Sequence, residues 1–299
     1  MNWERGQLAA LAAVVEHQTF DAAARALSIT PSAVSQRIRA LEAQLGQVAV
    51  TRSRPCRPTA AGAELVRLAR EFDLLEAEAE RRLGAGNGRV DLAVVVNADS
   101  LATWFREVLG AVADWTEVTL RLYIDDQEFS SARLRSAEAL AAVTSDPNPI
   151  QGCSVHPLGV MRYLPIATPG LVEQYRGEPA RHSDHPAVDW GAMPMIRFDA
   201  KDQLQDDLLA VVSPEARPPV HWVPSSADCA VAVGLGLGWA MLPEAQLGTS
   251  LDDGTMVRLA GSRHADVRLF WQRWRVGSES LDHLTDLVVR AARRDLRPG

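Results

Sequence analysis

The chain has 299 residues, 47% of them hydrophobic and 23% charged, a composition typical of a folded soluble protein and not of a disordered one. No apolar run is long enough to span a bilayer, and the polar start, Met1–Gln7, lacks the pattern of a signal peptide, so we expect a cytoplasmic protein. The length favours two or three domains. The three cysteines (Cys56, Cys153 and Cys229) lie far apart without metal-binding spacing, which predicts reduced thiols, no metal site and no cofactor.

Charge is distributed unevenly along the chain. Residues 1–60 hold seven arginines and four acidic residues, a net charge of +3, which leaves −10 for the rest of a chain whose total is −7. A basic segment attached to an acidic body favours a polyanionic partner for the basic segment alone.

The first 45 residues show the pattern of three short helices. Leu8, Leu11, Ala12 and Val15 recur at helical spacing, and Thr19 can cap a second, alanine-rich helix over Asp21–Leu27. After a short turn, Thr30 is the predicted N-cap and Pro31 the first residue of a third helix. This helix extends to about Leu45 and ends at Gly46. A tight turn followed by such a helix predicts a helix-turn-helix unit.

The third helix presents an unusual exposed face. Its expected buried stripe is Ala33, Val34, Ile38, Leu41 and Leu45, which leaves serine, glutamine and arginine side chains outside. Glutamine can read adenine in the major groove, and arginine can read guanine or contact phosphate. A two-stranded wing over residues 48–59 adds further arginines. The alternative is a three-helix module that binds protein. The predicted DNA-binding residues are Thr30, Pro31, Ser32, Ser35, Gln36, Arg37, Arg39, Arg52 and Arg54.

A long helix is predicted after Thr59, with a glycine-rich hinge at residues 84–88. Apolar residues follow one another at spacings of four and three, which is typical of a coiled-coil seam. A second copy of the chain is the simplest partner, and a two-fold dimer would place two recognition helices on two half-sites of DNA. The alternative is a helix packed on its own body. The predicted dimerisation residues are Leu65, Leu68, Phe72 and Leu75.

These features resemble the LysR-type transcriptional regulators. The resemblance spans the chain and is most specific in the segment AAARALSITPSAVSQRIRALEAQLG. The segments TRSRPCRPTAAG and PSSADCAVAVGLGLGWAMLPE are similar to the ArgP/LysG branch of that family, which implies a response to basic amino acids and control of their export. The resemblance also implies promoter DNA, a small-molecule effector and further copies of the chain, as a dimer or a dimer of dimers, as partners, with RNA polymerase as a further candidate.

The body alternates strand and helix patterns, which predicts parallel sheets with crossover helices. Strands are expected over 90–96, 118–124, 139–143, 163–167, 195–198, 255–259 and 267–274, and helices over 101–113, 227–235 and 281–294. The family resemblance implies a periplasmic-binding-protein-like α/β effector domain of two sub-domains. The predicted domains are a winged helix-turn-helix over 1–59, a linker helix and hinge over 60–88, and an effector domain over 89–299, with sub-domain I at 89–161 and 266–299 and sub-domain II at 162–265.

Polar loops that follow the predicted strands are the candidate effector site, because ligands bind beyond the strand ends of open parallel sheets. Serine and threonine side chains there can hold a carboxylate, and aspartates can pair with ammonium groups. The family resemblance makes L-lysine, L-arginine or L-histidine the expected ligand. The predicted effector-binding residues are Asn97, Asp99, Ser100, Asp125, Thr144, Phe198, Asp199, Asp202, Ser225 and Ser226.

Two other segments look like functional motifs. The run GLGLGW at residues 234–239 lacks the spacing of a nucleotide loop and is expected to be a turn, and the histidines at 182 and 185 are expected to be solvated. No nucleophile motif or Walker sequence is present, so catalysis is not predicted. Two rival functions stay open: an architectural or replication-modulating DNA-binding protein with little ligand response, and an enzyme with a DNA-binding head.

Overall fold

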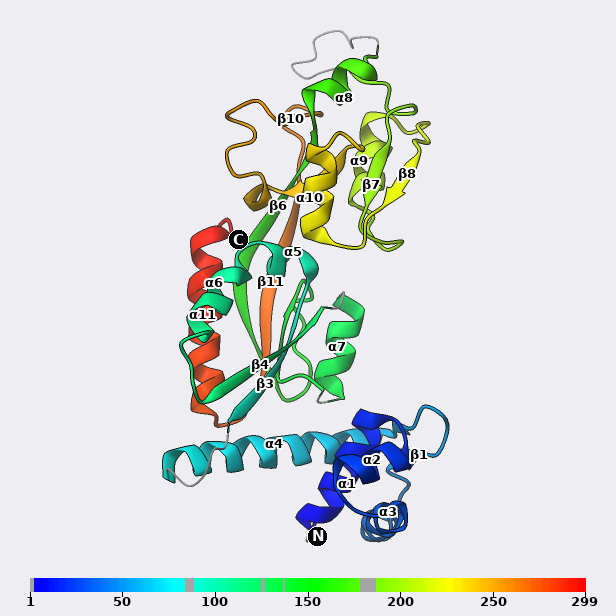
Figure 1. Cartoon of the computed structure of the whole chain (residues 1–299), viewed down its shortest axis with the longest axis vertical. Helices are drawn as coiled ribbons and strands as arrows, with labels where there is room; N and C mark the ends of the chain where they lie inside the picture. The colour runs from blue at the N-terminus through cyan, green and yellow to red at the C-terminus, as the bar shows by residue number, and fades with distance from the viewer. Residues whose placement is uncertain (1–2, 84–88, 125–126, 137, 178–186) are drawn as a thin grey trace. The chain divides into compact units, whose positions relative to one another are not determined.

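The computed structural model describes residues 3–83, 89–124, 127–136, 138–177 and 187–299 (Figure 1). The predicted hinge at 84–88 and the histidines at 182 and 185 therefore fall outside the described residues. The chain forms two compact units. Unit 1 contains residues 1–96, 111–156 and 271–287, and unit 2 contains residues 97–110, 157–270 and 288–299. None of the helices in the described part is both long and apolar enough to cross a membrane.

Unit 1 begins with a small helical head, residues 3–59. Val34, Ile38 and Leu41 are fully buried against the other head helices, as their helical spacing predicts. Thr19 and Thr30 accept hydrogen bonds from the second and third helices at their first turns, which confirms both predicted caps. The short antiparallel wing is also present. The elements are α1 (Arg5–His17), α2 (Phe20–Ala26), α3 (Pro31–Leu45), β1 (Val50–Thr51) and β2 (Arg57–Pro58).

The linker helix α4 (Ala60–Leu83) packs on the head along α1, and its ion pairs with α1 extend to Glu76. The Thr59 hydroxyl accepts the backbone N–H of Gly62 at 3.1 Å and donates to the carbonyl of Val48 at 2.7 Å, so the wing and the helix start are tied together. A Cβ at Gly62 would lie 1.8 Å from the carbonyl oxygen of Ala49, so only glycine allows this close approach. On the same side, Leu65 is buried.

The remainder of unit 1 is built on parallel strands. β3 (Val90–Val96) pairs with β4 (Val118–Ile124) in register from Val90 opposite Val118, and with β5 (Ala141–Thr144) on its other side. The end of β11 (Ala265–Trp274) continues the order as β11-β5-β3-β4. The helices α7 (Gln127–Arg135) and α11 (Glu279–Asp295) lie on either side of these strands (Figure 1).

Unit 2 contains a mixed arrangement of strands. β6 (Cys153–Ala167), which enters this unit from unit 1, pairs antiparallel with β9 and β10, while β7 and β8 form a separate parallel pair. Its core includes Leu164, Ile166, Ile196, Val233 and Leu242. The other elements are α5 (Ala98–Ala102), α6 (Phe105–Val112, ending in unit 1), α8 (Pro169–Gln174), β7 (Met195–Arg197), α9 (Leu204–Val212), β8 (Val220–Trp222), α10 (Ser226–Gly234), β9 (Ala240–Pro243), η1 (Glu244–Gln246) and β10 (Val257–Arg258).

Two predicted elements of the body are wrong in extent. The single helix expected over 101–113 is two helices, because Thr103 leaves the helical conformation and its hydroxyl donates to the carbonyl of Asp99 at 2.6 Å. The strand expected over 163–167 is the end of the much longer β6. Gly159 lies inside that strand at φ 138°, where a Cβ would come within 2.7 Å of the carbonyl oxygen of Arg297.

Candidate functional site: a DNA-binding head and a buried aspartate

The exposed face of α3 carries the polar side chains that its sequence predicts. Pro31, Ser32, Gln36 and Arg39 are exposed, and Ser35 is partly exposed. Arg39 donates from Nε to the carbonyl of Ser35 at 3.3 Å, and the side chain is exposed. This face therefore offers an amide, hydroxyls and a guanidinium from one half of a helix, a combination that can read base edges in a major groove.

Two of the predicted DNA-binding residues have structural tasks at the start of α3. Thr30 caps the helix by accepting the N–H of Ala33 at 3.2 Å, and its hydroxyl lies 2.9 Å from that of Ser32. Arg37 is only partly exposed, and its guanidinium lies beside Gly6 of α1. Thr30 and Arg37 therefore help to fix the position of α3, and they lie next to its exposed polar face.

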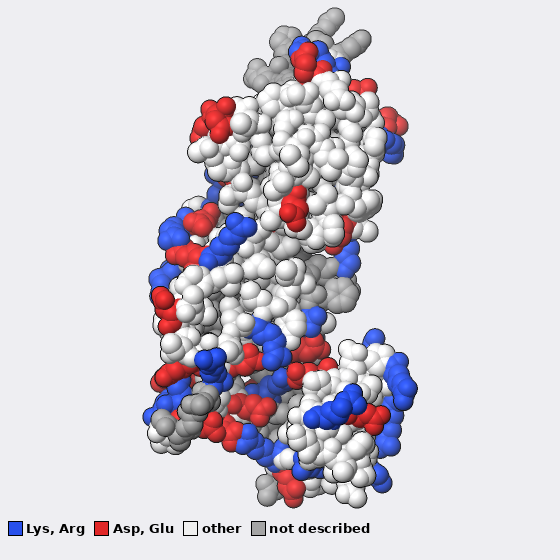
Figure 2. All heavy atoms as spheres, in the orientation of Figure 1, with Lys and Arg blue, Asp and Glu red and all other residues white. Residues whose placement is uncertain are grey.

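The wing adds positive charge next to the helix-turn-helix. Arg52 and Arg54 are exposed, and the Arg52 guanidinium lies 5.6 Å from the centre of the Phe20 ring at the start of α2. Arginine side chains gather over the head in the view of Figure 2, whereas arginine and acidic side chains alternate along α4. In this view, arginine side chains thus lie over the segment predicted to meet a polyanion.

The predicted dimerisation seam on α4 is only partly available. Leu65 is buried within its own chain and Leu68 is partly buried, whereas Phe72 is 48% and Leu75 is 42% exposed. Leu65 contributes to the packing of α4 on the head. The exposed part of the seam therefore lies further along the helix, at Phe72 and Leu75.

A second polar cluster lies in unit 2 around Asp99, on the short helix α5. The Asp99 carboxylate accepts hydrogen bonds from the hydroxyl of Ser226 at 2.5 Å and from the hydroxyl of Tyr163 at 2.7 Å. The Ser226 oxygen in turn accepts the side-chain amide of Gln246 at 2.8 Å. We call Asp99, Tyr163, Ser226 and Gln246 the Asp99 cluster.

Burial and a neighbouring carboxylate set the electrostatics of the Asp99 cluster. Burial raises the pKa of Asp99, and the neighbouring Asp202 adds to this effect, while the Ser226 and Tyr163 hydroxyls act against it. Both of these donors to Asp99 are neutral hydroxyls. The same surroundings raise the pKa of Tyr163, first through burial and then through the charge of Asp99.

Several buried polar atoms, on residues next to Asp99 in the sequence or in the cluster itself, have no hydrogen-bond partner among the described residues. They include the Ser100 hydroxyl, on a residue with no exposed surface, the side-chain carbonyl of Asn97, and that of Gln246. Buried polar groups are nearly always hydrogen-bonded in folded proteins, so a group of unpaired ones points to a ligand or to water. Asn97 and Ser100 are both predicted effector-binding residues.

The loop after β7 carries three more predicted residues. Asp199 accepts the backbone N–H groups of Lys201 and Asp202 at 2.8 and 3.0 Å, and Asp202 accepts the N–H of Phe198 at 3.3 Å. Asp202 also accepts the side chain of Gln205 at 3.1 Å. Asp199 thus shapes its own loop, whereas Asp202 adds negative potential at Asp99.

The remaining predicted effector residues fall in both compact units. Ser225 caps α10 next to Ser226, and Thr144 belongs to unit 1, where its hydroxyl accepts the N–H of Asp146 at 3.1 Å. Asp125 lies outside the described residues. Sequence reasoning missed Tyr163 and Gln246, because it placed Tyr163 in a strand without a functional role and gave Gln246 none.

Comparison with known proteins decides the family. Residues 6–63 match the bacterial regulatory helix-turn-helix protein family, lysR type, and residues 84–293 match the LysR substrate binding domain. The chain belongs to the LysR family of transcriptional regulators. Its predicted fold class is thereby confirmed: a winged helix-turn-helix and a linker helix precede an α/β effector domain of two sub-domains.

Individual relatives cover the whole LysR-type chain. The lysine export transcriptional regulatory protein LysG of Corynebacterium glutamicum is 43% identical, over 98% of this chain and 99% of its own. The transcriptional regulator ArgP of Pseudomonas aeruginosa is 37% identical, over 95% and 94%. Among solved structures, full-length LysG from Corynebacterium glutamicum with the bound effector Arg gives a TM-score of 0.83 at 42% identity over 100% of both chains, and ArgP from Mycobacterium tuberculosis gives 0.83 at 44% over 98% of both.

Proposed function

We propose that this LysR-type regulator binds promoter DNA as a dimer or a dimer of dimers and responds to a basic amino acid, L-arginine or L-lysine, with L-histidine as a further candidate. Its regulated gene is an amino-acid exporter. This choice is supported by the similarity to LysG of Corynebacterium glutamicum, which is named a lysine export regulator and whose structure has been determined with bound arginine. RNA polymerase is the expected protein partner at the promoter.

The observation that carries the proposal is the Asp99 cluster. A buried carboxylate held by two neutral hydroxyls needs a positive partner, and an ammonium group supplies one. The unpaired Ser100 hydroxyl can donate to the α-carboxylate of the same ligand. A zwitterion therefore matches both kinds of group, and the second positive charge of a basic amino acid suits the negative potential of Asp202.

On DNA, α3 is the element proposed to read sequence. Gln36 is the exposed amide suited to adenine, Arg39 contacts guanine or phosphate, Ser32 and Ser35 contact bases or phosphates, and Arg52 and Arg54 follow the backbone. Two such helices, carried by two chains, require half-sites about one turn of DNA apart, roughly 34–36 Å or a multiple of it.

The experiment is a DNA-binding titration of the full chain. A labelled fragment from upstream of its own gene is compared with a shuffled fragment, with and without L-arginine, L-lysine or L-leucine. Preference for the native fragment, together with a change in affinity or bending caused by the basic amino acids alone, supports the proposal. Equal binding of both fragments, insensitive to any amino acid, favours the architectural alternative.

A further inference from the structure

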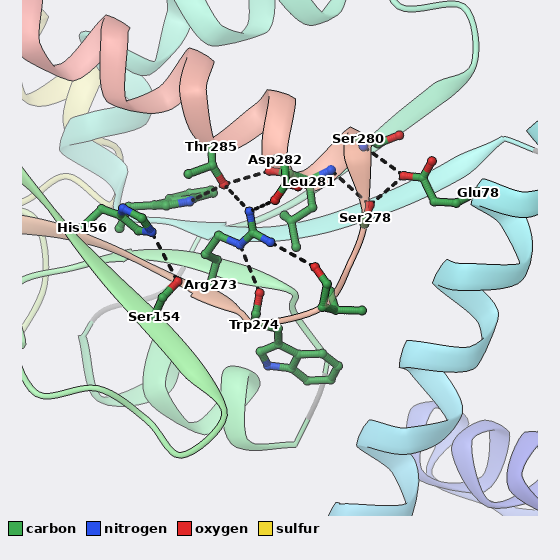
Figure 3. A network of polar contacts seen from close by, with 12 residues as sticks. Glu78, Ser154, His156, Arg273, Trp274, Ser278, Ser280, Leu281, Asp282 and Thr285 are labelled. Atoms are coloured by element: carbon green, nitrogen blue, oxygen red, sulfur yellow. Dashed lines mark hydrogen bonds and ion pairs between the residues drawn. The ribbon is translucent and has the colours of Figure 1, made fainter. Parts of the chain in front are cut away.

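The last part of the linker helix α4 carries a buried carboxylate. Glu78 is 2% exposed, although it lies on a helix whose other acidic side chains are more exposed. Its Oε1 atom accepts the hydroxyl of Ser278 at 2.7 Å and the backbone N–H of Ser280 at 2.9 Å. Both donors belong to the start of α11, so this side chain joins α4 to the C-terminal helix (Figure 3).

Glu78 completes the N-terminal cap of α11. Ser278 is the cap residue, since its oxygen accepts the N–H of Leu281 at 3.2 Å while its hydrogen goes to Glu78. A carboxylate at a helix N-terminus also interacts favourably with the helix dipole. These bonds, together with that from Arg81, outweigh burial and hold the pKa of Glu78 down to about 2, so the side chain is ionised at neutral pH.

Arginines close the contact from the α4 side. Arg81 donates to the other oxygen of Glu78 at 3.1 Å and to Glu279 at 2.7 Å, and Arg82 reaches Glu279 at 2.8 Å. Arg81 therefore joins an acidic residue of α4 to the first residue of α11. We call Glu78, Arg81, Ser278, Glu279 and Ser280 the Glu78 clasp.

The segment that presents Ser278 is itself fixed. Arg273, at the end of β11, donates to the carbonyls of Trp274 at 3.0 Å and Val276 at 3.2 Å, and it forms an ion pair with Asp282 in the first turn of α11 (Figure 3). These bonds hold the segment between β11 and α11 in place, so Ser278 cannot move separately from the start of α11.

The helix that begins at the clasp continues into the other compact unit. Residues 279–287 of α11 belong to unit 1, and residues 288–295 belong to unit 2, which also contains the Asp99 cluster. A helix transmits displacement along its axis because its backbone hydrogen bonds make it stiff. One continuous element therefore connects the unit that holds the proposed effector site with the residue that holds the linker helix.

We propose that Glu78 is the positioning residue through which the effector domain controls the linker helix and, with it, the DNA-binding heads. The Glu78 clasp is a charged, directional contact whose loss leaves the Ser280 N–H without its partner. A change in the position of α11 is therefore passed to α4. This role of Glu78 rests on one part of the proposed function, namely that a bound amino acid changes DNA binding.

The test uses the full chain with Glu78→Gln, which keeps the shape and removes the charge. Its control is Glu80→Gln, an exposed glutamate two residues further along α4. We expect Glu78→Gln to bind L-arginine within about twofold of the unmodified chain but to reduce the arginine-induced change in operator affinity or bending at least about fivefold, the lower end of usual allosteric couplings. The Glu80→Gln control should respond normally.

An unchanged arginine response in Glu78→Gln overturns the proposal, even if that variant melts at a lower temperature, because a purely structural role affects stability alone. If Glu78→Gln does not fold, Ser278→Ala replaces it, since this variant keeps the carboxylate and the Ser280 contact; it too must weaken the response.

Hydrogen exchange without any amino acid separates failure of this proposal from failure of the proposed function. Glu78→Gln should speed exchange at residues 74–83 of α4 and 278–284 of α11, and Glu80→Gln should not. A chain unresponsive to every amino acid refutes the proposed function. Unchanged exchange in Glu78→Gln refutes the clasp in either case.

Discussion

Gln36 is the exposed side chain of α3 whose chemistry distinguishes one base pair from another most directly. Its amide can both donate to and accept from adenine, whereas the neighbouring serines bond equally well to phosphates. We expect Gln36→Ala to lower affinity for the operator by about 1–3 kcal/mol and to relax its sequence preference. Salt-sensitive binding to unrelated DNA should remain, because the arginines that supply it are intact.

The matched control for this variant is Gln44→Ala, an exposed glutamine near the end of the same helix. Fluorescence anisotropy with operator and shuffled DNA at two salt concentrations measures both the sequence-specific and the non-specific affinity. Normal discrimination by Gln36→Ala would show that α3 presents a different face to the bases.

Asp99 should make amino-acid binding depend on pH in one direction. Burial raises its pKa above the ordinary value of 3.8, and only the ionised carboxylate attracts an ammonium group. Affinity for L-arginine is therefore full above the raised pKa and falls as the pH is lowered through it. This fall begins at a higher pH than an ordinary aspartate would give.

Calorimetric titrations from about pH 8 down to about pH 4, close to the pKa of an ordinary aspartate, measure this dependence. Asp99→Asn should bind weakly and without that dependence, and Asp228→Asn, a change at an exposed aspartate on α10, should behave like the unmodified chain. Affinity that rises on acidification would be inconsistent with a carboxylate–ammonium contact at Asp99.

The candidate site could be predicted from the sequence only in part. Asp99, Ser100 and Ser226 were predictable because each lies in a polar segment at a strand end or helix start. The partners of Asp99 were not, since Tyr163 and Ser226 are 64 and 127 positions away from it in sequence. Thr144 is the last residue of β5 and Asn97 directly follows β3, yet the two residues belong to different units, which strand-end reasoning does not reveal.

Among the elements, the joint between the wing and α4 depends on one glycine. A Cβ at Gly62 would overlap the carbonyl of Ala49, whereas a Cβ at Gly110, also in a helix, would meet nothing within 4 Å. Gly62→Ala should therefore destabilise the chain by about 1–3 kcal/mol despite its better helix propensity, as overpacking does. Gly110→Ala should stabilise it by about 0.5–1 kcal/mol.

Thermal unfolding followed by circular dichroism compares the two glycine variants. Their opposite signs are the diagnostic result, since both changes are the same in chemistry and differ only in surroundings. A stabilised Gly62→Ala variant would mean that α4 does not approach the wing as closely as the structure shows.

The linker helix is also the element proposed to form the dimer. Phe72 is half exposed and Leu68 partly so, and burying them against a second chain would remove apolar surface from water. Changing both to glutamate should yield monomers in sedimentation velocity at micromolar concentration. Val48→Glu, at a 59% exposed valine of the head, serves as the control. A dimer of unaltered stability in the double variant would place the interface elsewhere.

The elements themselves were predictable where the pattern was local. β3 and β4 match their predicted ranges, because an apolar run is typical of a buried strand such as β3 and an alternating run is typical of a partly exposed strand such as β4. The break between α5 and α6 was not predictable from periodicity, since it comes from the non-helical backbone of Thr103, at φ −123° and ψ −111°, and not from a change in the apolar pattern. Nor was the length of β6, because Pro157 and Gly159 read as strand breakers.

At the scale of the whole molecule, the chain joins a basic head to an acidic effector domain of two sub-domains. The predicted sub-domain boundaries at 161/162 and 265/266 stay predictions, and the compact units divide the same strands, β6 and β11, a few residues away. Each of these strands has residues in both units. The sequence pattern predicts where such a strand lies, but it does not predict the residue at which the chain passes from one unit to the other.

The central claim of this account is that a basic amino acid binds at Asp99 and is recognised by its charge. Calorimetric titration of the full chain with L-arginine, L-lysine and L-leucine, repeated on Asp99→Asn, tests it most directly. We predict saturable binding of arginine or lysine, none of leucine, and at least about a tenfold loss in the variant, equivalent to about 1.4 kcal/mol. Equal binding of leucine, or undiminished arginine binding by Asp99→Asn, would contradict the account.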